Sequence, residues 1–223
     1  DTTTPSNCAI APTSGNVILA NGVVGKWIVS GFKVSSSAGG YGIAVLNGSF
    51  VEVQFIDYGV FNAAQTFSHN ICVNATLNRL NSCKVSGGAY AHVQVDNGGV
   101  VNESSIDVET TSAVTFTKAW SYVTTNSLHF SFNMSYTGIA NVTGQKFFVD
   151  MNSCIDQINA VSTTKVFPGT IAGFADAATG GNISPIGHVE IRESPTWAMI
   201  PPGSEWDTGT QTFLFESDKI RWP

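Results

Sequence analysis

Charged side chains are scarce in this 223-residue chain, because Asp, Glu, Lys and Arg together make up only 12% of it. That is about half the usual share in soluble domains. The 10 basic residues form no cluster and are outnumbered by 16 acidic ones, which argues against duplex nucleic acid as a partner. No apolar run reaches the roughly 18 residues of a membrane span, and no signal peptide is recognisable. Since the chain starts at Asp1 rather than at Met, we expect a processed protein or a fragment of a longer one.

Cysteine and histidine are also few. The cysteines show no CxxC spacing, and their number is too small for a disulfide-dense scaffold, so we expect buried free thiols. The histidines are dispersed, and neither a Gly-rich phosphate loop nor a GxSxG motif occurs. The sequence therefore predicts no metal and no cofactor. The residues concerned are Cys8, Cys72, Cys83, Cys154, His69, His92, His129 and His188.

An internal repeat is the main positive feature. Four segments align by eye, beginning at Gly42, Asn70, His92 and Phe116, and the earlier segment 16–35 has a similar pattern. Each unit alternates apolar and polar residues with period two, which is typical of strands. Small or polar corners interrupt the alternation at Asn47-Gly48, Asn74-Ala75 and Asn97-Gly98. The alignment treats four apolar residues as corresponding inward positions: Ile43, Ile71, Val93 and Phe116.

Such units cannot bury their apolar sides alone, whereas coils stacked on one another can. We therefore predict an all-β protein, a right-handed parallel β-helix (solenoid) over residues 15–181, preceded by a lead-in over residues 1–14. An antiparallel sandwich is the alternative, but it should show two-residue hairpin turns between its strands. The segment 182–223 is rich in Pro and Trp and contains two predicted strands, GHVEIRES and TQTFLFESDKIRW. We expect it to cap the open solenoid end and to contribute to trimerisation.

Polar residues between the inward positions are expected to point outward. The alignment places Asp57, Lys84, Asp107 and His129 in one outward column, which would form a structural ladder of alternating charge or one side of a polar groove for a sugar polymer. Glu103 is unusual because it falls beside the inward Leu80, where an unpaired carboxylate would be costly. We expect a local bulge to turn it outward, the alternative being a special role.

Candidate functional residues follow from this arrangement. Hydrolysis of a glycosidic bond needs two carboxylates, and outward carboxylates on neighbouring coils meet that spacing easily. Aromatic and polar side chains could line a glycan site, although such aromatics are more often core or rim residues. The catalytic candidates are Asp57, Glu103 and Asp107, and the glycan-binding candidates are Tyr90, Trp120, Tyr122 and His129.

The tract NVTGQKFFVDMNSCIDQINAVSTTKVFPGTIAGFADAATGG, residues 141–181, resembles the closing part of β-helical tail spike and tail fibre proteins of tailed bacteriophages. The similar features are a final rung like KFFVDMNSCID, a Phe-Pro-Gly turn and a Thr-Gly-Gly segment. The resemblance implies a homotrimer on the virion tail, assembled in the bacterial cytoplasm, that contacts other tail proteins. It also implies recognition of host capsule or lipopolysaccharide. Some members cleave this glycan, but no catalytic motif of the family can be placed on this chain.

We therefore expect a tail spike or tail fibre fragment that mediates adhesion to a bacterial surface polysaccharide. Three alternatives stay open. The chain could be a polysaccharide depolymerase, either hydrolase or lyase, or a purely structural trimerisation region of a larger virion protein. It could also be a secreted glycoprotein, since six Asn-x-Ser/Thr sequons are present, although a chain so rich in Asn, Ser and Thr contains them by chance.

Overall fold

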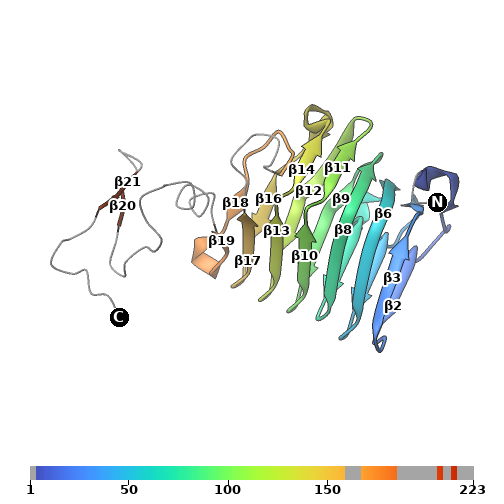
Figure 1. Ribbon diagram of the computed structural model, residues 1–223, viewed down its shortest axis with the longest axis horizontal. Helices are drawn as coiled ribbons and strands as arrows, with labels where there is room; N and C mark the ends of the chain where they lie inside the picture. Colours follow the sequence, from blue (N-terminus) through green and yellow to red (C-terminus); the bar gives the residue numbers. More distant parts are fainter. Residues whose placement is uncertain (1–3, 159–166, 185–204, 208–211, 215–223) are drawn as a thin grey trace.

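The computed structural model describes residues 4–158, 167–184, 205–207 and 212–214. Its strands are nearly all parallel and coil through about six turns into a β-solenoid. Figure 1 shows these coils stacked side by side, with the N-terminal coil and the β17–β19 region at opposite ends of the stack. The predicted parallel β-helix is thereby confirmed.

Two walls of parallel strands run along the stack. Wall A has 11 strands: β1 (Ala9–Ile10), β3 (Lys26–Ser30), β4 (Lys33–Ser36), β6 (Phe50–Phe61), β8 (Thr76–Val85), β10 (Val100–Ser104), β11 (Asp107–Thr110), β13 (Leu128–Phe132), β14 (Ser135–Thr137), β17 (Cys154–Ile158) and β19 (Asn182–Ser184). Wall B has eight: β2 (Ile18–Asn21), β5 (Ile43–Leu46), β7 (Asn70–Val73), β9 (Ala89–Asp96), β12 (Val114–Val123), β15 (Val142–Thr143), β16 (Phe147–Val149) and β18 (Phe174–Ala175).

The remaining described elements are short. Four 3-10 turns lie between strands: η1 (Pro5–Asn7), η2 (Ala63–Gln65), η3 (Ile139–Asn141) and η4 (Ala177–Thr179). The last two strands, β20 (Glu205–Asp207) and β21 (Thr212–Leu214), pair with each other in antiparallel fashion. β21 lies within the second strand predicted for the C-terminal segment. The first one, at residues 187–194, lies outside the described residues, as does most of the predicted cap.

Asparagine makes the tight corners between wall B and wall A. Asn47, Asn74 and Asn97 adopt left-handed backbone conformations, with φ of 52°, 46° and 50°. Asparagine tolerates this region better than most residues. The corners stack on one another, and the Asn47 N–H donates to the Val73 carbonyl of the next coil at 3.1 Å. The predicted corners are thus confirmed.

The predicted alignment of inward positions is wrong by one residue in part of wall B. Ile43 lies opposite Asn70, not Ile71, and Val93 also lies opposite Asn70. Asn70 can occupy this interior position because its amide is satisfied there. The Tyr58 hydroxyl donates to Asn70 Oδ1 at 2.9 Å, and Asn70 Nδ2 donates to the His92 carbonyl at 3.2 Å. A slip of one residue exchanges the inward and outward faces of a strand, so it changes which side chains enter the core.

Most of the interior consists of stacked apolar columns, and each fully buried aliphatic side chain contributes about 1.5–3 kcal/mol. One inward column of wall A is different, because charged and polar side chains replace the aliphatic ones of its first coils from Arg79 onward. Its members are Val29, Val53, Arg79, Glu103, Ser131 and Gln157, all of them buried.

Candidate functional site

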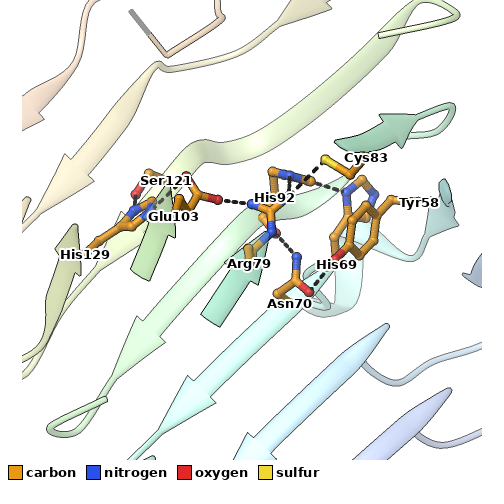
Figure 2. Close-up of polar contacts among 9 residues, drawn as sticks. All are labelled: Tyr58, His69, Asn70, Arg79, Cys83, His92, Glu103, Ser121 and His129. Atoms are coloured by element: carbon orange, nitrogen blue, oxygen red, sulfur yellow. Dashed lines mark hydrogen bonds and ion pairs between the residues drawn. The ribbon is translucent and has the colours of Figure 1, made fainter. Parts of the chain in front are cut away.

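A connected set of polar side chains fills the middle of the solenoid. Figure 2 shows Ser121, His129 and Glu103 at one end of this set and Tyr58 and His69 at the other. None of the side chains drawn there belongs to a residue more than 7% exposed. We call these residues the interior network: Tyr58, His69, Asn70, Arg79, Cys83, His92, Glu103, Ser121 and His129.

An ion pair between Arg79 and Glu103 forms its centre. The two residues are in-register neighbours on β8 and β10, and Arg79 Nη1 donates to Glu103 Oε1. The other carboxylate oxygen, Oε2, lies 3.1 Å from His129 Nε2. Burial alone would raise the pKa of Glu103, but Arg79 and then His129 outweigh it, so that the pKa is lowered. Glu103 is therefore an ionised carboxylate in the core.

The prediction that a bulge turns Glu103 outward is wrong. Leu80, which the alignment had placed inward, lies opposite Gln54 and is half-buried, while Arg79 takes the inward position. Glu103 points inward because this guanidinium is there to compensate its charge.

Arg79 also determines where the protons of two histidines lie. Its Nη2 is 2.8 Å from His92 Nε2, and a guanidinium can only donate, so Nε2 must accept. Neutral His92 then carries its proton on Nδ1, which donates to His69 Nδ1 at 2.9 Å. The proton of His69 accordingly lies on Nε2. Burial and then the Arg79 charge lower the pKa of His69 to about 3 and the pKa of His92 well below 6.5, so both rings are neutral near pH 7.

Ser121, His129 and Glu103 follow one another as the members of a nucleophile–base–acid triad would. Ser121 Oγ lies 2.7 Å from His129 Nδ1. All three residues are at most 1% exposed, and Phe167 stacks on the His129 ring with centroids 5.5 Å apart. A nucleophile must reach its substrate, and this serine is closed off from solvent. The interior network is therefore a structural feature, and the outward position predicted for the glycan-binding candidate His129 is wrong.

The outer face of wall B presents a second constellation. Tyr122 lies opposite Phe148, and Phe148 lies opposite Phe174, on three successive coils. The ring centroids are 5.8 Å apart for the first pair and 5.4 Å for the second, while Tyr90 lies 6.0 Å from Tyr122. The first three residues are half-buried, and Phe174 is 47% exposed. We call these four residues, Tyr90, Tyr122, Phe148 and Phe174, the aromatic ladder.

Charged side chains accompany the ladder. The Lys118 ammonium lies 3.4 Å from the Phe148 ring centroid and 4.9 Å from that of Tyr122. Asp150 follows Phe148 by two residues, as Asp176 follows Phe174, and the Asp176 N–H donates to the Val149 carbonyl at 2.8 Å. Burial raises the pKa of Tyr122, and the Asp150 carboxylate raises it further. Acidic side chains thus border the aromatic rings along successive coils.

The remaining candidates are placed as follows. Trp120 is 1% exposed, and its ring packs inside against His92 at 4.4 Å between centroids, so it offers no face to a sugar on the outer surface. Asp57 lies opposite Lys84 as predicted, but it is buried against Lys33 Nζ at 3.3 Å and accepts from the Ser86 hydroxyl at 2.6 Å. Asp107 is exposed, yet it lies opposite Ser82 rather than Lys84. The structure therefore does not bring Asp57, Glu103 and Asp107 together in one solvent-accessible site.

Two of the ladder residues, Tyr90 and Tyr122, were predicted from the sequence, and two were missed. A signal for the missed pair exists in the sequence. The final strands of the wall B coils read QVD (94–96), FVD (148–150) and FAD (174–176), with YVT (122–124) between the first and second. Aligning these triplets would have placed Phe148 and Phe174 in the column of Tyr122.

Other kinds of site are not evident in the described part of the chain. None of the four cysteines is paired in a disulfide. Cys72 and Cys83 are buried as predicted, whereas Cys8 is exposed and Cys154 is half-buried. Among residues 4–158, 167–184 and the two short strands, no three His, Cys, Asp or Glu residues are grouped so as to hold a metal ion. No helix of the described chain has the length and hydropathy to cross a membrane.

The fold and the ladder together define a class: a parallel β-solenoid with a buried charge network and an outer aromatic column. Comparison with known proteins adds no closer assignment, since no family model, curated protein or solved structure matches the chain.

Proposed function

We propose that this chain is an adhesion module that binds a bacterial surface polysaccharide through the aromatic ladder, as part of a phage tail spike or tail fibre. The observation that carries the proposal is the column Tyr122–Phe148–Phe174, one ring per coil on the outer face of wall B. Aromatic faces carry negative charge density, which attracts the polarised C–H groups on one side of a pyranose ring.

The spacing of the ladder favours a polymer over a single sugar. Parallel coils repeat every ~4.8 Å, so the column offers one aromatic ring per coil along the solenoid axis. A polysaccharide lying along that axis would meet one ring after another. Each contact would be weak, and several copies of the chain on one particle would supply useful binding through avidity.

Depolymerase activity has less support from the predicted residues. Glu103 is buried in an ion pair, and Asp57 is 4% exposed and engaged by Lys33 and Ser86. A general acid or base must come within hydrogen-bond reach of the substrate, which neither residue does in this arrangement.

Binding of the chain to an array of bacterial capsule and lipopolysaccharide glycans tests the proposal. We expect Tyr122→Ala and Phe148→Ala each to weaken binding of the best array glycan by about three- to tenfold, by analogy with the 0.5–1.5 kcal/mol of an aromatic pair. Phe130→Ala and Phe132→Ala are matched controls, since these rings are 37% and 39% exposed on β13 of wall A. Equal losses in both sets, or no glycan bound, would contradict the proposal.

A further inference from the structure

A cation already occupies part of the aromatic ladder. The Tyr122 and Phe148 rings are 5.8 Å apart with an angle of 67° between their planes, so they form two sides of an open cage. The Lys118 ammonium lies within this cage, 3.4 Å from the Phe148 centroid and 4.9 Å from the Tyr122 centroid. Both distances fall within the roughly 6 Å over which a ring face attracts a cation.

Carboxylates reinforce the preference of the cage for positive charge. The charge of Asp150 acts on both Lys118 and Tyr122, and that of Asp96 acts on Tyr122. Backbone bonds from Thr124 to Val95 and from Asp150 to Val123 place the two aspartates two coils apart, so they lie roughly 10 Å apart along the stack. A polyanionic glycan lying on the ladder would therefore meet repulsion, whereas a cationic one would not.

We infer that the Tyr122–Phe148 cage, with Asp150 beside it, binds an ammonium group of the glycan, and that Lys118 is the internal substitute for that group in the free protein. The ligand class is a polysaccharide with unacetylated amino sugars. This inference rests on the proposed glycan-binding function of the ladder and specifies its ligand.

Lys118 can give way to such a ligand. Its side chain is half-buried at the surface of wall B rather than fixed in the core, and burial lowers its pKa while Asp150 opposes that effect. Moving the ammonium back into water recovers its hydration, and an amino sugar then takes over the contacts with the two rings. Ligand and Lys118 thus compete for one cage.

Competition predicts an unusual mutational effect. Lys118→Met retains an apolar stem of similar length but removes the charge, so no internal cation then competes with an external one for the two rings. We expect this variant to bind amino-sugar oligomers about two- to fivefold more tightly than the natural chain, the range of a surface cation–π contact. Asp150→Asn should weaken amino-sugar binding more than binding of the acetylated form.

The test is calorimetric titration with two oligomers of equal length, one of β-1,4-linked glucosamine and one of its N-acetylated counterpart, at a pH where the amines are charged. We expect the natural chain to prefer the glucosamine oligomer and Lys118→Met to widen that preference. Lys84→Met is the matched control, because Lys84 is a 46% exposed lysine on wall A, paired with Glu109 at 3.5 Å, and should leave the preference unchanged.

The outcomes separate the two proposals. Equal affinity for both oligomers, or a preference for the acetylated one, together with Tyr122-dependent binding, would overturn the ammonium site and leave glycan binding intact. An unchanged or weaker preference in Lys118→Met would also overturn it. Absence of binding to either oligomer and to every glycan of the array would overturn both proposals.

Discussion

Arg79 and Glu103 lie opposite each other on adjacent coils and form an ion pair at 2% and 1% exposure, inside a core that is otherwise mostly apolar. Such a pair is a weak contributor to net stability, because desolvation of both charges offsets their attraction. Replacing only one of the two residues should strongly destabilise the fold, because the remaining charge is left buried and uncompensated.

Glu103→Gln should therefore lower the free energy of unfolding by about 3–5 kcal/mol, and Arg79→Met by a similar amount. The double variant Arg79→Met/Glu103→Gln should recover much of the loss, because no unpaired charge then remains. Urea unfolding of the natural chain and the three variants measures the coupling in a double-mutant cycle. Additive losses would show that the two charges do not compensate each other.

The surface pair Lys84–Glu109 provides the comparison. Its atoms are 3.5 Å apart, and both side chains are about half exposed, at 46% and 53%. Solvent screening limits such pairs to about 0–1 kcal/mol, so Glu109→Gln should hardly change the urea midpoint. A loss as large as that of Glu103→Gln would mean that burial is not the cause of the effect.

Lowering the pH should destabilise the fold already at pH values well above those at which most carboxylates titrate. The pKa of His69 is lowered to about 3 and that of His92 well below 6.5, while both are near 6.5 in the unfolded chain. From pH 6.5 down towards 3 the unfolded state thus binds more protons, and stability is lost as the pH falls. With two such groups, the free energy of unfolding should fall by about 2.7 kcal/mol for each pH unit of acidification near pH 5.

Unfolding free energies measured between pH 4.5 and 8 check this expectation. His69→Gln removes one of the two groups, so it should roughly halve the slope whatever its effect on absolute stability. A flat profile down to pH 5 in the natural chain would show that the buried histidines are not neutral, contrary to the tautomers derived from Arg79.

The thiols should differ strongly in reactivity. Burial raises the pKa of Cys72 to about 12 and that of Cys83 to about 11, so neither is a thiolate near neutral pH. Mass spectrometry after brief treatment with iodoacetamide should find Cys8 modified first, Cys154 more slowly, and the two buried residues only after unfolding. Early modification of Cys83 would contradict the closed interior.

Glycine is required where neighbouring coils touch. A Cβ at Gly87 would collide with the backbone of Gly59 and Val60, whereas one at Gly48 would meet nothing within 4 Å. Gly87→Ala should therefore cost several kcal/mol or prevent folding, and Gly48→Ala only about 1–2 kcal/mol for its left-handed backbone. Equal thermal stability of the two variants would contradict the observed stacking of coils.

The fold could be predicted because its signal recurs in every coil. Period-two alternation and the corners at Asn47, Asn74 and Asn97 depend on local preferences, which a single sequence displays. The coil-to-coil register could not be predicted from the sequence. Leu80 is apolar and Arg79 is charged, so hydrophobicity alone places the leucine inside. Only the simultaneous presence of Glu103 on the next coil makes an inward arginine acceptable.

The same limit explains the site predictions. Tyr90 and Tyr122 are outward as expected. Trp120 is buried, next to a register shift of β12 between Phe116 and Ala119, and His129 is buried because it belongs to the interior network. Phe148 belongs to the tract that resembles phage proteins, but the resemblance does not place it beside Tyr122. That placement depends on the register between neighbouring coils. That register is a property of stacked coils, which single-strand patterns do not specify.

A crystal structure of the protein soaked with its best-binding array glycan would show where on the solenoid the polysaccharide lies. We expect sugar rings on the faces of Tyr122, Phe148 and Phe174, with the polymer running along the solenoid axis and Lys118 displaced wherever an amino sugar is bound. Sugar density confined to wall A, or to a position away from the aromatic ladder, would contradict it.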